Sequence, residues 1–287
     1  MVIKTSPTAG DVVHLREMTA ADLPAAHRLS RGEKWPHRLE DWEYMFHLGQ
    51  GFVAQSDGKV AGTIMVWPYG DGAATLGMVI VSPTCRGQGL GRKLMTAALE
   101  RMGGRAVKLN ATPDGLALYE SLGFAATGAI MQHQGTAAPV PIVELGPVER
   151  VRPMGAGDAD TIIALDRRST GLARDALISD LMENARGIVL DRDEEAVGFA
   201  LFRRFGLGYS IGPTVAPDAQ GAKALIAYWL SLHTGMFVRL DVPEDSGLSP
   251  WLEQNGMLNV GRVVTMVKGD WPVTTDGSFS IVSQALG

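Results

Sequence analysis

The chain has 287 residues, of which 46% are hydrophobic and 20% charged, and at about 150 residues per domain this length predicts two globular domains. No run approaches the roughly 20 apolar residues that cross a bilayer, and the N-terminus lacks an apolar signal segment, which excludes an integral membrane protein and argues against secretion. The net charge of −5 argues against a nucleic-acid binder, and the single cysteine, Cys85, excludes an internal disulfide and a cysteine-based metal site. We therefore expect a cytoplasmic protein with no bound metal, no membrane contact and no nucleic-acid partner.

The first half of the sequence alternates between strand and helix patterns. Strands are expected at residues 12–18, 51–55, 60–67, 74–81, 107–111 and 124–134. Helices are expected at residues 21–31, 39–48, 89–102 and 115–122. Asp57 and Gly58 have the composition of a hairpin turn, and residues 135–146, with two prolines and two glycines, are expected to form a linker.

The second half follows the same plan. Strands are expected at residues 148–152, 187–190, 196–205, 209–215, 237–242 and 258–268, and helices at 156–165, 174–185, 220–233 and 248–254. Mixed strands with interspersed helices predict an α+β (mixed α/β) fold with two tandem domains, at residues 11–135 and 147–268. Each domain would be a twisted mixed sheet flanked by helices. The tail at residues 269–287 is either a loose end or an added strand.

Three short motifs recur in the same order in the two halves. The pattern R-x-M-x-A-x-D begins at Arg16 and again at Arg152. The segment 81–83 (V-S-P) matches 215–217 (V-A-P), and the segment 122–124 (L-G-F) has a looser counterpart at 255–257 (N-G-M). Because the offset between the copies drifts only slowly, we infer a duplicated domain.

The most informative segment is a glycine-rich turn that follows an apolar strand and opens a helix, at residues 81–92. The start of a helix presents unpaired backbone N–H groups and a partial positive charge, which suit a phosphate or pyrophosphate. Glycines let the backbone approach such an anion, and here they are Gly87, Gly89 and Gly91. The glycine pattern alone is equally compatible with a turn that binds nothing. It departs from the dinucleotide fingerprint G-x-G-x-x-G and has no G-K-[ST] of a P-loop.

Arg86-x-x-Gly89-x-Gly91 resembles the R-x-x-G-x-G motif with which the GNAT superfamily of N-acetyltransferases binds acetyl-CoA. The preceding Val81-x-Pro83 is similar to the family's bulged strand, and residues 118–124 (L-Y-E-S-L-G-F) resemble its Y-E-x-x-G-F segment. The whole layout, one GNAT-like half followed by a divergent half, resembles tandem-GNAT proteins.

The resemblance implies a role for individual residues. Backbone groups of the strand would pair with the pantetheine arm, the turn would hold the pyrophosphate, and a polar side chain on the next strand would bond the pantetheine or a water. The residues concerned are Met78, Val79, Ile80, Val81, Arg86, Gly87, Gln88, Gly89, Leu90, Gly91, Arg92 and Asn110. Tyr119 matches the family's general acid, which gives a proton to the departing thiolate. A phenol with a pKa near 10 still carries that proton at neutral pH.

One departure from the family affects the chemistry. Many members carry a glutamate on the fourth strand as general base, but residues 73–81 contain no carboxylate. An alkylammonium must lose a proton before it attacks, so the base lies elsewhere or a water chain serves. Candidates for the base or for acceptor binding are Glu33, Trp35, His37, Asp41 and His133. The alternative for each is an ordinary surface residue without a function.

The second half lacks the residues that the resemblance assigns to cofactor binding and proton donation. Aligned by the repeat, Gln220 and Lys223 stand opposite Arg86 and Gly89, and Leu252 replaces Tyr119. We expect this half not to bind acetyl-CoA and either to complete the acceptor pocket or to form a homodimer interface. Residues 166–174 are the most polar segment of this half. Either Asp166 and Arg174 at its two ends bind the acceptor, or the segment is a loop that leads into a surface helix at Arg174.

These observations predict an acetyl-CoA-dependent N-acetyltransferase that transfers the acetyl group directly to a primary amine of a small molecule. A non-catalytic acyl-CoA sensor and a protein-lysine acetyltransferase are the alternatives. An enzyme for proteins predicts an open acidic groove, whereas an enzyme for small molecules predicts a pocket closed by the second half.

Overall fold

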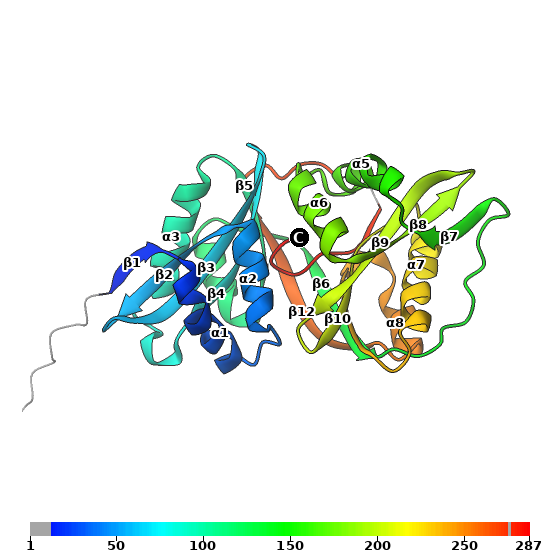
Figure 1. Ribbon diagram of the computed structural model, residues 1–287. Coiled ribbons are helices and arrows are strands. Elements are labelled where there is room, and N and C mark those ends of the chain that lie inside the picture. The colour runs from blue at the N-terminus through cyan, green and yellow to red at the C-terminus, as the bar shows by residue number, and fades with distance from the viewer. Residues whose placement is uncertain (1–12, 275–276) are drawn as a thin grey trace, which may run out of the picture.

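A computed structural model describes residues 13–274 and 277–287 of the chain and shows two halves of matching design (Figure 1). The first half contains β1 (His14–Glu17), α1 (Leu23–Gly32), α2 (Leu39–Leu48), β2 (Gln50–Ser56), β3 (Lys59–Tyr69), β4 (Ala73–Val81), α3 (Leu90–Met102), β5 (Ala106–Ala111), α4 (Leu116–Ser121) and β6 (Ala125–Thr136). The second contains β7 (Glu149–Pro153), α5 (Ala159–Thr170), α6 (Asp175–Asn184), β8 (Arg186–Arg192), β9 (Glu195–Phe205), β10 (Gly208–Val215), α7 (Ala219–Leu232), β11 (Phe237–Pro243), α8 (Ser249–Gln254) and β12 (Leu258–Lys268). The identical order of elements confirms the mixed α/β fold and the inferred duplication.

The repeated R-x-M-x-A-x-D motif fixes the start of the first helix in each half. The guanidinium of Arg16 donates to both carboxylate oxygens of Asp22 at 2.6 and 2.7 Å, and Asp22 also accepts from the N–H of Thr19. Arg152 and Asp158 repeat the arrangement at 2.8 Å. The Arg16 guanidinium lowers the pKa of Asp22 to about 2. The motif is therefore a structural clamp between the first strand and the helix that follows it.

The last strands of the two halves are exchanged. β12 of the second half pairs with β5 of the first, from Val264 opposite Ala111 to Lys268 opposite Val107. β6 of the first half pairs with β11 of the second, from Phe237 opposite Thr136 onward. The two exchanged strands also pair with each other, so that one continuous sheet crosses the molecule, with β6 and β12 at its centre (Figure 1). The pattern of the sequence, which assigned residues 124–134 and 258–268 to their own halves, did not anticipate this exchange.

A central apolar core joins the two halves, while α3 and α7 cover separate cores at the two ends of the sheet. The central core combines α2 and α6 with the C-terminal tail; its buried members include Trp42, Met45, Leu177, Leu181, Phe199, Val282 and Leu286. Between the same two helices the hydroxyl of Tyr44 donates to Asp180 at 2.6 Å. The halves therefore share one interior rather than touching through a polar surface.

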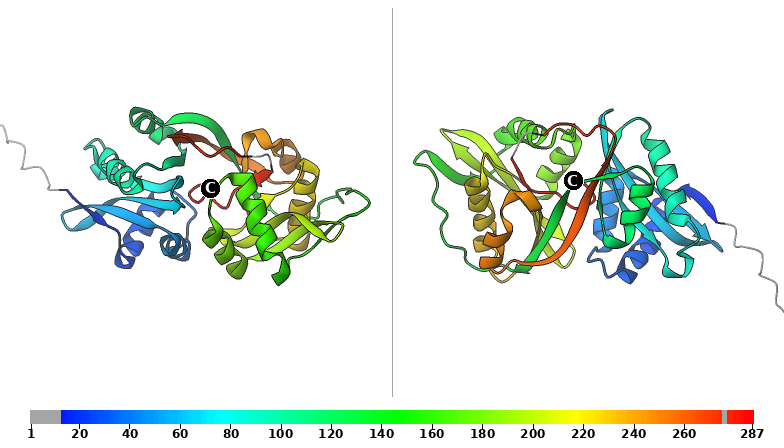
Figure 2. Two further views of the ribbon diagram at one scale, coloured as in Figure 1. Left: turned by 90° about the horizontal axis from the view of Figure 1, so that it is seen from above. Right: turned by 180° about the vertical axis from the view of Figure 1, so that it is seen from behind.

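The C-terminal tail is an added strand followed by a buried segment. β13 (Ser278–Ser280) pairs with β10, and the end of the chain then lies between the halves in every view (Figures 1 and 2). The hydroxyl of Tyr69 donates to the carbonyl oxygen of Leu286 at 2.8 Å, and the guanidinium of Arg174 donates to that of Gly287 at 2.7 Å. The tail is thus anchored to both halves.

Arg174 was expected either to bind the acceptor or to open a surface helix, but its side chain is only 2% exposed. Its guanidinium donates to both oxygens of the equally buried Asp166 at 2.8 Å. A buried pair of this kind is costly to break, because the remaining charge has neither water nor a partner.

We expect Arg174→Met to lower the free energy of unfolding by about 3 to 5 kcal/mol, because Asp166 is left buried and unpaired. Urea denaturation at neutral pH measures this. The control is Arg262→Met, which breaks the exposed pair with Glu244 and should leave the midpoint almost unchanged. Equal effects of the two substitutions would show that the buried pair contributes no more than the exposed one.

Candidate functional site

The fourth strand bulges and then diverges from its neighbour. β4 and β5 run parallel and pair through Ala73–Thr75 only. A register shift against β3 follows, where Met78 has a φ of +53° and its carbonyl oxygen accepts from the hydroxyl of Thr63 at 2.8 Å. Beyond the bulge, the edge of β4 that faces β5 has no partner strand among the described residues. Residues 78–81, expected to pair with the cofactor, form this free edge.

The glycine-rich turn leads from β4 into α3. Gly87 and Gly89 have φ values of +77° and +74°, a region that residues with a Cβ rarely adopt. No atom lies within 4 Å of a Cβ built at either position, so the space in front of the turn is open. The first N–H groups of α3 lack intrahelical partners and point out of the helix start, which makes the turn suitable for an anion.

An open cavity of about 840 Å³ follows this turn and the free edge of β4. Its lining includes Val79, Ile80, Val81, Arg86, Gly87, Gly89, Leu90, Gly91, Arg92 and Tyr119. Nine of the twelve residues expected to bind the cofactor are therefore brought together; Met78 and Asn110 line an adjacent, smaller cavity instead, and Gln88 lines neither. Arg86 pairs with Glu33 at 2.5 Å, and Arg92 donates to the hydroxyl of Ser121 at 2.7 Å.

A second cavity, of about 210 Å³, adjoins the first; it is smaller and less open and is called the closed cavity below. The first half contributes Trp35, Pro36, His37, Leu76, Gly77, Met78, Val79, Leu109, Asn110, Thr112, Tyr119 and Gln132. The second half contributes Phe205, Arg239 and Val263, and the tail contributes Ser283, Gln284 and Ala285. The second half and the tail therefore wall this cavity, and Ala285 packs so closely on Gly77 that a Cβ there would lie 3.0 Å from the alanine methyl.

Tyr119 lies where the two cavities meet, together with Trp35, Val79 and Thr112. Its ring packs edge-on against Phe124 and so closely on Gly115 that a Cβ at Gly115 would lie 2.5 Å from the ring. Burial raises the pKa of Tyr119 to about 12. The phenol therefore keeps its proton throughout the neutral range.

His37 is the titratable imidazole of the closed cavity. Its ring lies 5.7 Å from that of Trp35 and 5.4 Å, edge-on, from that of Phe205. Its Nδ1 atom is buried, and no hydrogen bond reaches it from any described residue. Burial lowers the pKa of His37 to about 4, with a further lowering by Arg239. The imidazole is therefore neutral at pH 7.

The other candidates have structural roles. Asp41 is 4% exposed and accepts from the N–H and guanidinium of Arg38 and from the N–H of Gly206. His133 is fully buried on β6, with one ring nitrogen 2.9 Å from the carbonyl oxygen of Met257 and the other 2.9 Å from the Ser249 hydroxyl. Neither lines a cavity of the site.

Of the five candidates for the base or for acceptor binding, Trp35 thus lines both cavities, His37 lines the closed one and Glu33 lines the open one. The amide of Asn110 holds the tail: it donates to the carbonyl oxygen of Gln284 and accepts from the hydroxyl of Thr265, both at 2.8 Å. Sequence reasoning missed Phe205, Arg239 and Gln284, because only the folded halves and tail bring them to this cavity.

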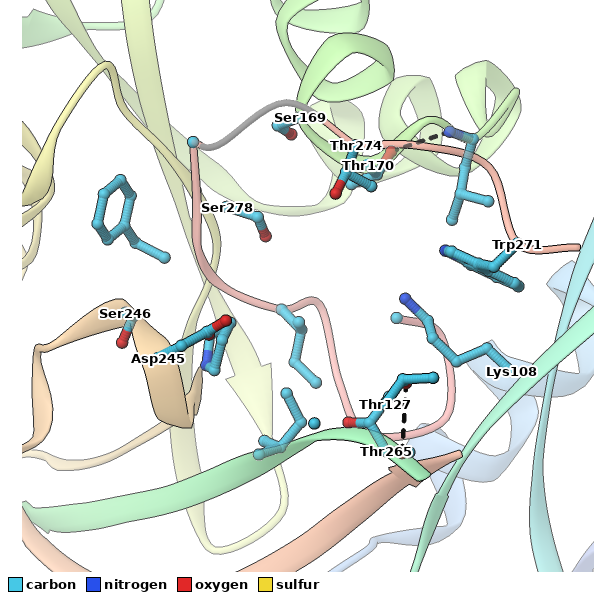
Figure 3. A pocket seen from close by; sticks show the side chains of 18 of the residues that line it. Lys108, Thr127, Ser169, Thr170, Asp245, Ser246, Thr265, Trp271, Thr274 and Ser278 are labelled. Atoms are coloured by element: carbon cyan, nitrogen blue, oxygen red, sulfur yellow. Dashed lines mark hydrogen bonds between the residues drawn. The ribbon is translucent and has the colours of Figure 1, made fainter. Parts of the chain in front are cut away.

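In the second half, the tail fills the place that corresponds to the free edge of β4. β10 and β11 pair in parallel at their start. Further along, β13 pairs with β10, and the N–H of Ile281 donates to the carbonyl oxygen of Asp241 on β11 at 3.0 Å. A third cavity, of about 670 Å³, lies beside this segment, with Ser278, Ser169 and Lys108 among the side chains around it (Figure 3).

No group of three or more His, Cys, Asp or Glu side chains that could hold a metal ion occurs in the described part of the chain. Within residues 13–274 and 277–287, no helix has the length and apolar character needed to cross a membrane.

The neutral state of His37 predicts a pH dependence of stability. The folded pKa near 4 lies below the unfolded value of about 6.5, so the unfolded chain binds more protons between these values. The contribution of His37 to the free energy of unfolding is therefore fully present above about pH 6.5 and is lost as the pH falls toward 4. Between pH 7 and pH 4.5 we expect the free energy of unfolding of the wild type to fall by about 2 kcal/mol more than that of His37→Asn. Urea denaturation at the two pH values measures both. Parallel losses in the two proteins would show that His37 titrates normally.

The comparisons with known proteins agree with this geometry. The model of the acetyltransferase (GNAT) family matches residues 15–124, and that of the acetyltransferase (GNAT) domain matches residues 162–278. Holothin acyltransferase of Pseudoalteromonas sp. (strain SANK 73390) is 28% identical over 251 residues, which cover 84% of this chain and 82% of the relative. The uncharacterized N-acetyltransferase YitH of Bacillus subtilis (strain 168) is 23% identical over 267 residues, 91% of this chain and 93% of that one.

Two solved structures show the same fold. A putative acetyltransferase from Pyrococcus horikoshii superposes with a TM-score of 0.79 at 19% identity, over 100% of this chain and 99% of that one. A tandem GNAT protein from the clavulanic acid biosynthesis pathway superposes with a TM-score of 0.64 at 15% identity, over 92% of this chain and 100% of that one. The chain belongs to the GNAT acetyltransferases: it is an acyltransferase with one GNAT domain in each half.

Proposed function

We propose that the protein transfers the acetyl group of acetyl-CoA directly to the primary amine of a small molecule. The observation that carries this proposal is the meeting of two cavities at Tyr119, one open along the glycine-rich turn and the other closed by the second half and the tail. A donor in one cavity and an acceptor in the other would meet at this junction, and direct transfer requires such proximity.

The open cavity fits acetyl-CoA in charge and in backbone geometry. The start of α3 offers N–H groups to a pyrophosphate, and Gly87 and Gly89 keep side chains away from it. The unpaired edge of residues 78–81 offers N–H and carbonyl groups to the amides of the pantetheine arm, as a neighbouring strand would. Bound there, acetyl-CoA supplies an activated acyl group at the junction.

We assign to Tyr119 the protonation of the sulfur that leaves. Tyr119 belongs to the wall shared by the two cavities, and its phenol holds its proton at neutral pH. Burial that raises the pKa of a phenol also raises that of a thiol at the same place, so the proton transfer stays within reach of a positioned acid.

The size of the closed cavity favours a small acceptor over a protein lysine. About 210 Å³ accommodates a compact molecule, and among the described residues the lining of this cavity, which includes Phe205, Arg239 and the tail, contains no aspartate or glutamate. The Pseudoalteromonas relative is named for acylating holothin. From this relative we extend acyl transfer, and not its acceptor, to the present chain.

Calorimetry with acetyl-CoA tests the cofactor site. We expect Gly89→Glu to weaken binding at least about 100-fold, or about 2.7 kcal/mol, because a carboxylate would face the phosphates from a backbone position that disfavours any Cβ. The matched control is Lys223→Glu, the counterpart position in the second half, which should bind one acetyl-CoA per chain like the wild type. Two sites per chain, or loss of binding in the control only, would contradict the assignment to the first half.

Removal of the Tyr119 hydroxyl tests whether this residue is the general acid. We expect Tyr119→Phe to lower kcat about 100-fold with an unchanged Kd for acetyl-CoA, because the phenyl ring keeps the packing and only the proton donor is lost. The control is Tyr228→Phe on α7, outside the three cavities described. Steady-state assay of thiol release measures both. A change in kcat of less than threefold for Tyr119→Phe would rule out the proposed role.

A further inference from the structure

The closed cavity has no carboxylate in its wall. Its lining among the described residues contains one guanidinium, that of Arg239, and one imidazole, that of His37, but no aspartate or glutamate. The remaining lining is apolar, aromatic, amide or hydroxyl. A cationic substrate entering this cavity would leave water without meeting an anionic partner, and such a transfer is unfavourable.

Two buried carboxylates that lie behind the wall, Asp241 and Asp41, are already committed. Both oxygens of Asp241 accept from the guanidinium of Arg239 at 2.9 Å, and Asp241 also accepts from the amide of Gln284 at 3.1 Å. Asp41 is held by Arg38 and by the N–H of Gly206. Because these groups satisfy one another, none is free to pair with an alkylammonium.

The groups that face His37 keep it a weak base. Arg239 and Arg203 bring positive charge toward it, His27 lies nearby, and Asp41 is the one carboxylate that acts on it in the opposite sense. With its pKa lowered to about 4 by burial, His37 would be about a million-fold too weak to deprotonate an alkylammonium with a pKa near 10.4. It is strong enough to take a proton from a nitrogen that is itself weakly basic.

Three aromatic side chains shape the cavity: Trp35, Tyr119 and Phe205. His37 lies between two of them, edge-on to Phe205. A small space with aromatic walls favours a flat ring, because a ring stacks on such walls and buries its faces against them.

We propose that the acceptor is a weakly basic amine on a flat unsaturated ring, an aryl or heteroaryl amine that is neutral at pH 7. This inference rests on the proposed acetyl transfer and names the substrate class of the same site. In the transfer, the amine nitrogen forms a bond to the acetyl carbon while the carbon–sulfur bond breaks. Tyr119 gives its proton to the sulfur, the neutral His37 takes the proton that the nitrogen releases, and solvent returns a proton from His37 to Tyr119. This acceptor class also explains why β4 carries no carboxylate, because a neutral amine has no extra proton to lose before it attacks.

Competing amines of similar size test the inference on the full chain. Aniline and 2-aminothiazole are neutral at pH 7, whereas benzylamine and cyclohexylamine are protonated. With saturating acetyl-CoA, we expect kcat/KM for the neutral amines to exceed that for the charged ones at least about 100-fold at pH 7, given the small unprotonated fraction of an alkyl amine. The rate with aniline should stay flat from pH 6 to pH 9, while that with benzylamine should rise about tenfold per unit. Thiol release measures these rates, and mass spectrometry identifies the N-acetyl products.

A charge introduced into the wall gives a second test. Gln132→Glu adds a carboxylate to the closed cavity and should raise kcat/KM for benzylamine about tenfold while changing that for aniline less. The matched control is Gln134→Glu, two residues along β6 and outside the lining, which should leave the preference unchanged.

The outcomes separate the two proposals. A wild type that acetylates benzylamine at least as fast as aniline at pH 7 would overturn the acceptor class and leave acetyl transfer intact. Binding of acetyl-CoA without turnover of either neutral amine would also overturn the acceptor class. Failure to bind acetyl-CoA would instead overturn the proposed function.

Discussion

The pairing of β5 with β12 and of β11 with β6 is the constraint on which the rest of the structure depends. Each half leaves the edge of its own fifth strand open and has it completed by the other half. Because unpaired backbone groups are costly once buried, neither sheet is complete without the other half. The exchange brings the halves face to face, buries α2 and α6 in one core, and brings Phe205 and Arg239 to the wall of a cavity in the first half. The closed cavity is therefore a product of the exchange rather than of either domain.

The two halves share one strand geometry, but among the described residues the tail occupies it in the second half only. In both halves a pair of parallel strands separates after a bulge and exposes the edge of the earlier strand. In the first half that edge remains free beside the glycine-rich turn. In the second half β13 hydrogen-bonds to it, and the same tail continues to Gln284 and Ala285 in the wall of the closed cavity. One segment thus satisfies the strand edge of the second half and encloses the site of the first.

Local patterns in the sequence predicted the features that local physics determines. The Asp57–Gly58 turn has positive φ at both residues, and the glycines of the turn before α3 adopt the left-handed backbone that the motif requires. The partners of β6 and β12 were not predictable in this way, because alternation along a strand tells which face is buried and not which strand lies beside it. Asp41, His133 and Arg174 were misread as functional or exposed for a related reason: their hydrogen-bond partners come from distant segments, among them Gly206, Met257 and the tail.

Burial favours the neutral forms of both Tyr119 and His37 in the closed cavity, although it shifts their pKa values in opposite directions. It raises the pKa of Tyr119 and lowers that of His37, and in each case the neutral form is favoured. A cavity in which Tyr119 and His37 are neutral, and beside which Asp41 and Asp241 are held by arginines, has little means to stabilise a charged reactant. It can still move protons between neutral groups as bonds form and break, since each group differs from its usual pKa in the direction that resists premature ionisation. In the proposed transfer, the enclosure that limits the size of the acceptor would therefore also select its protonation state.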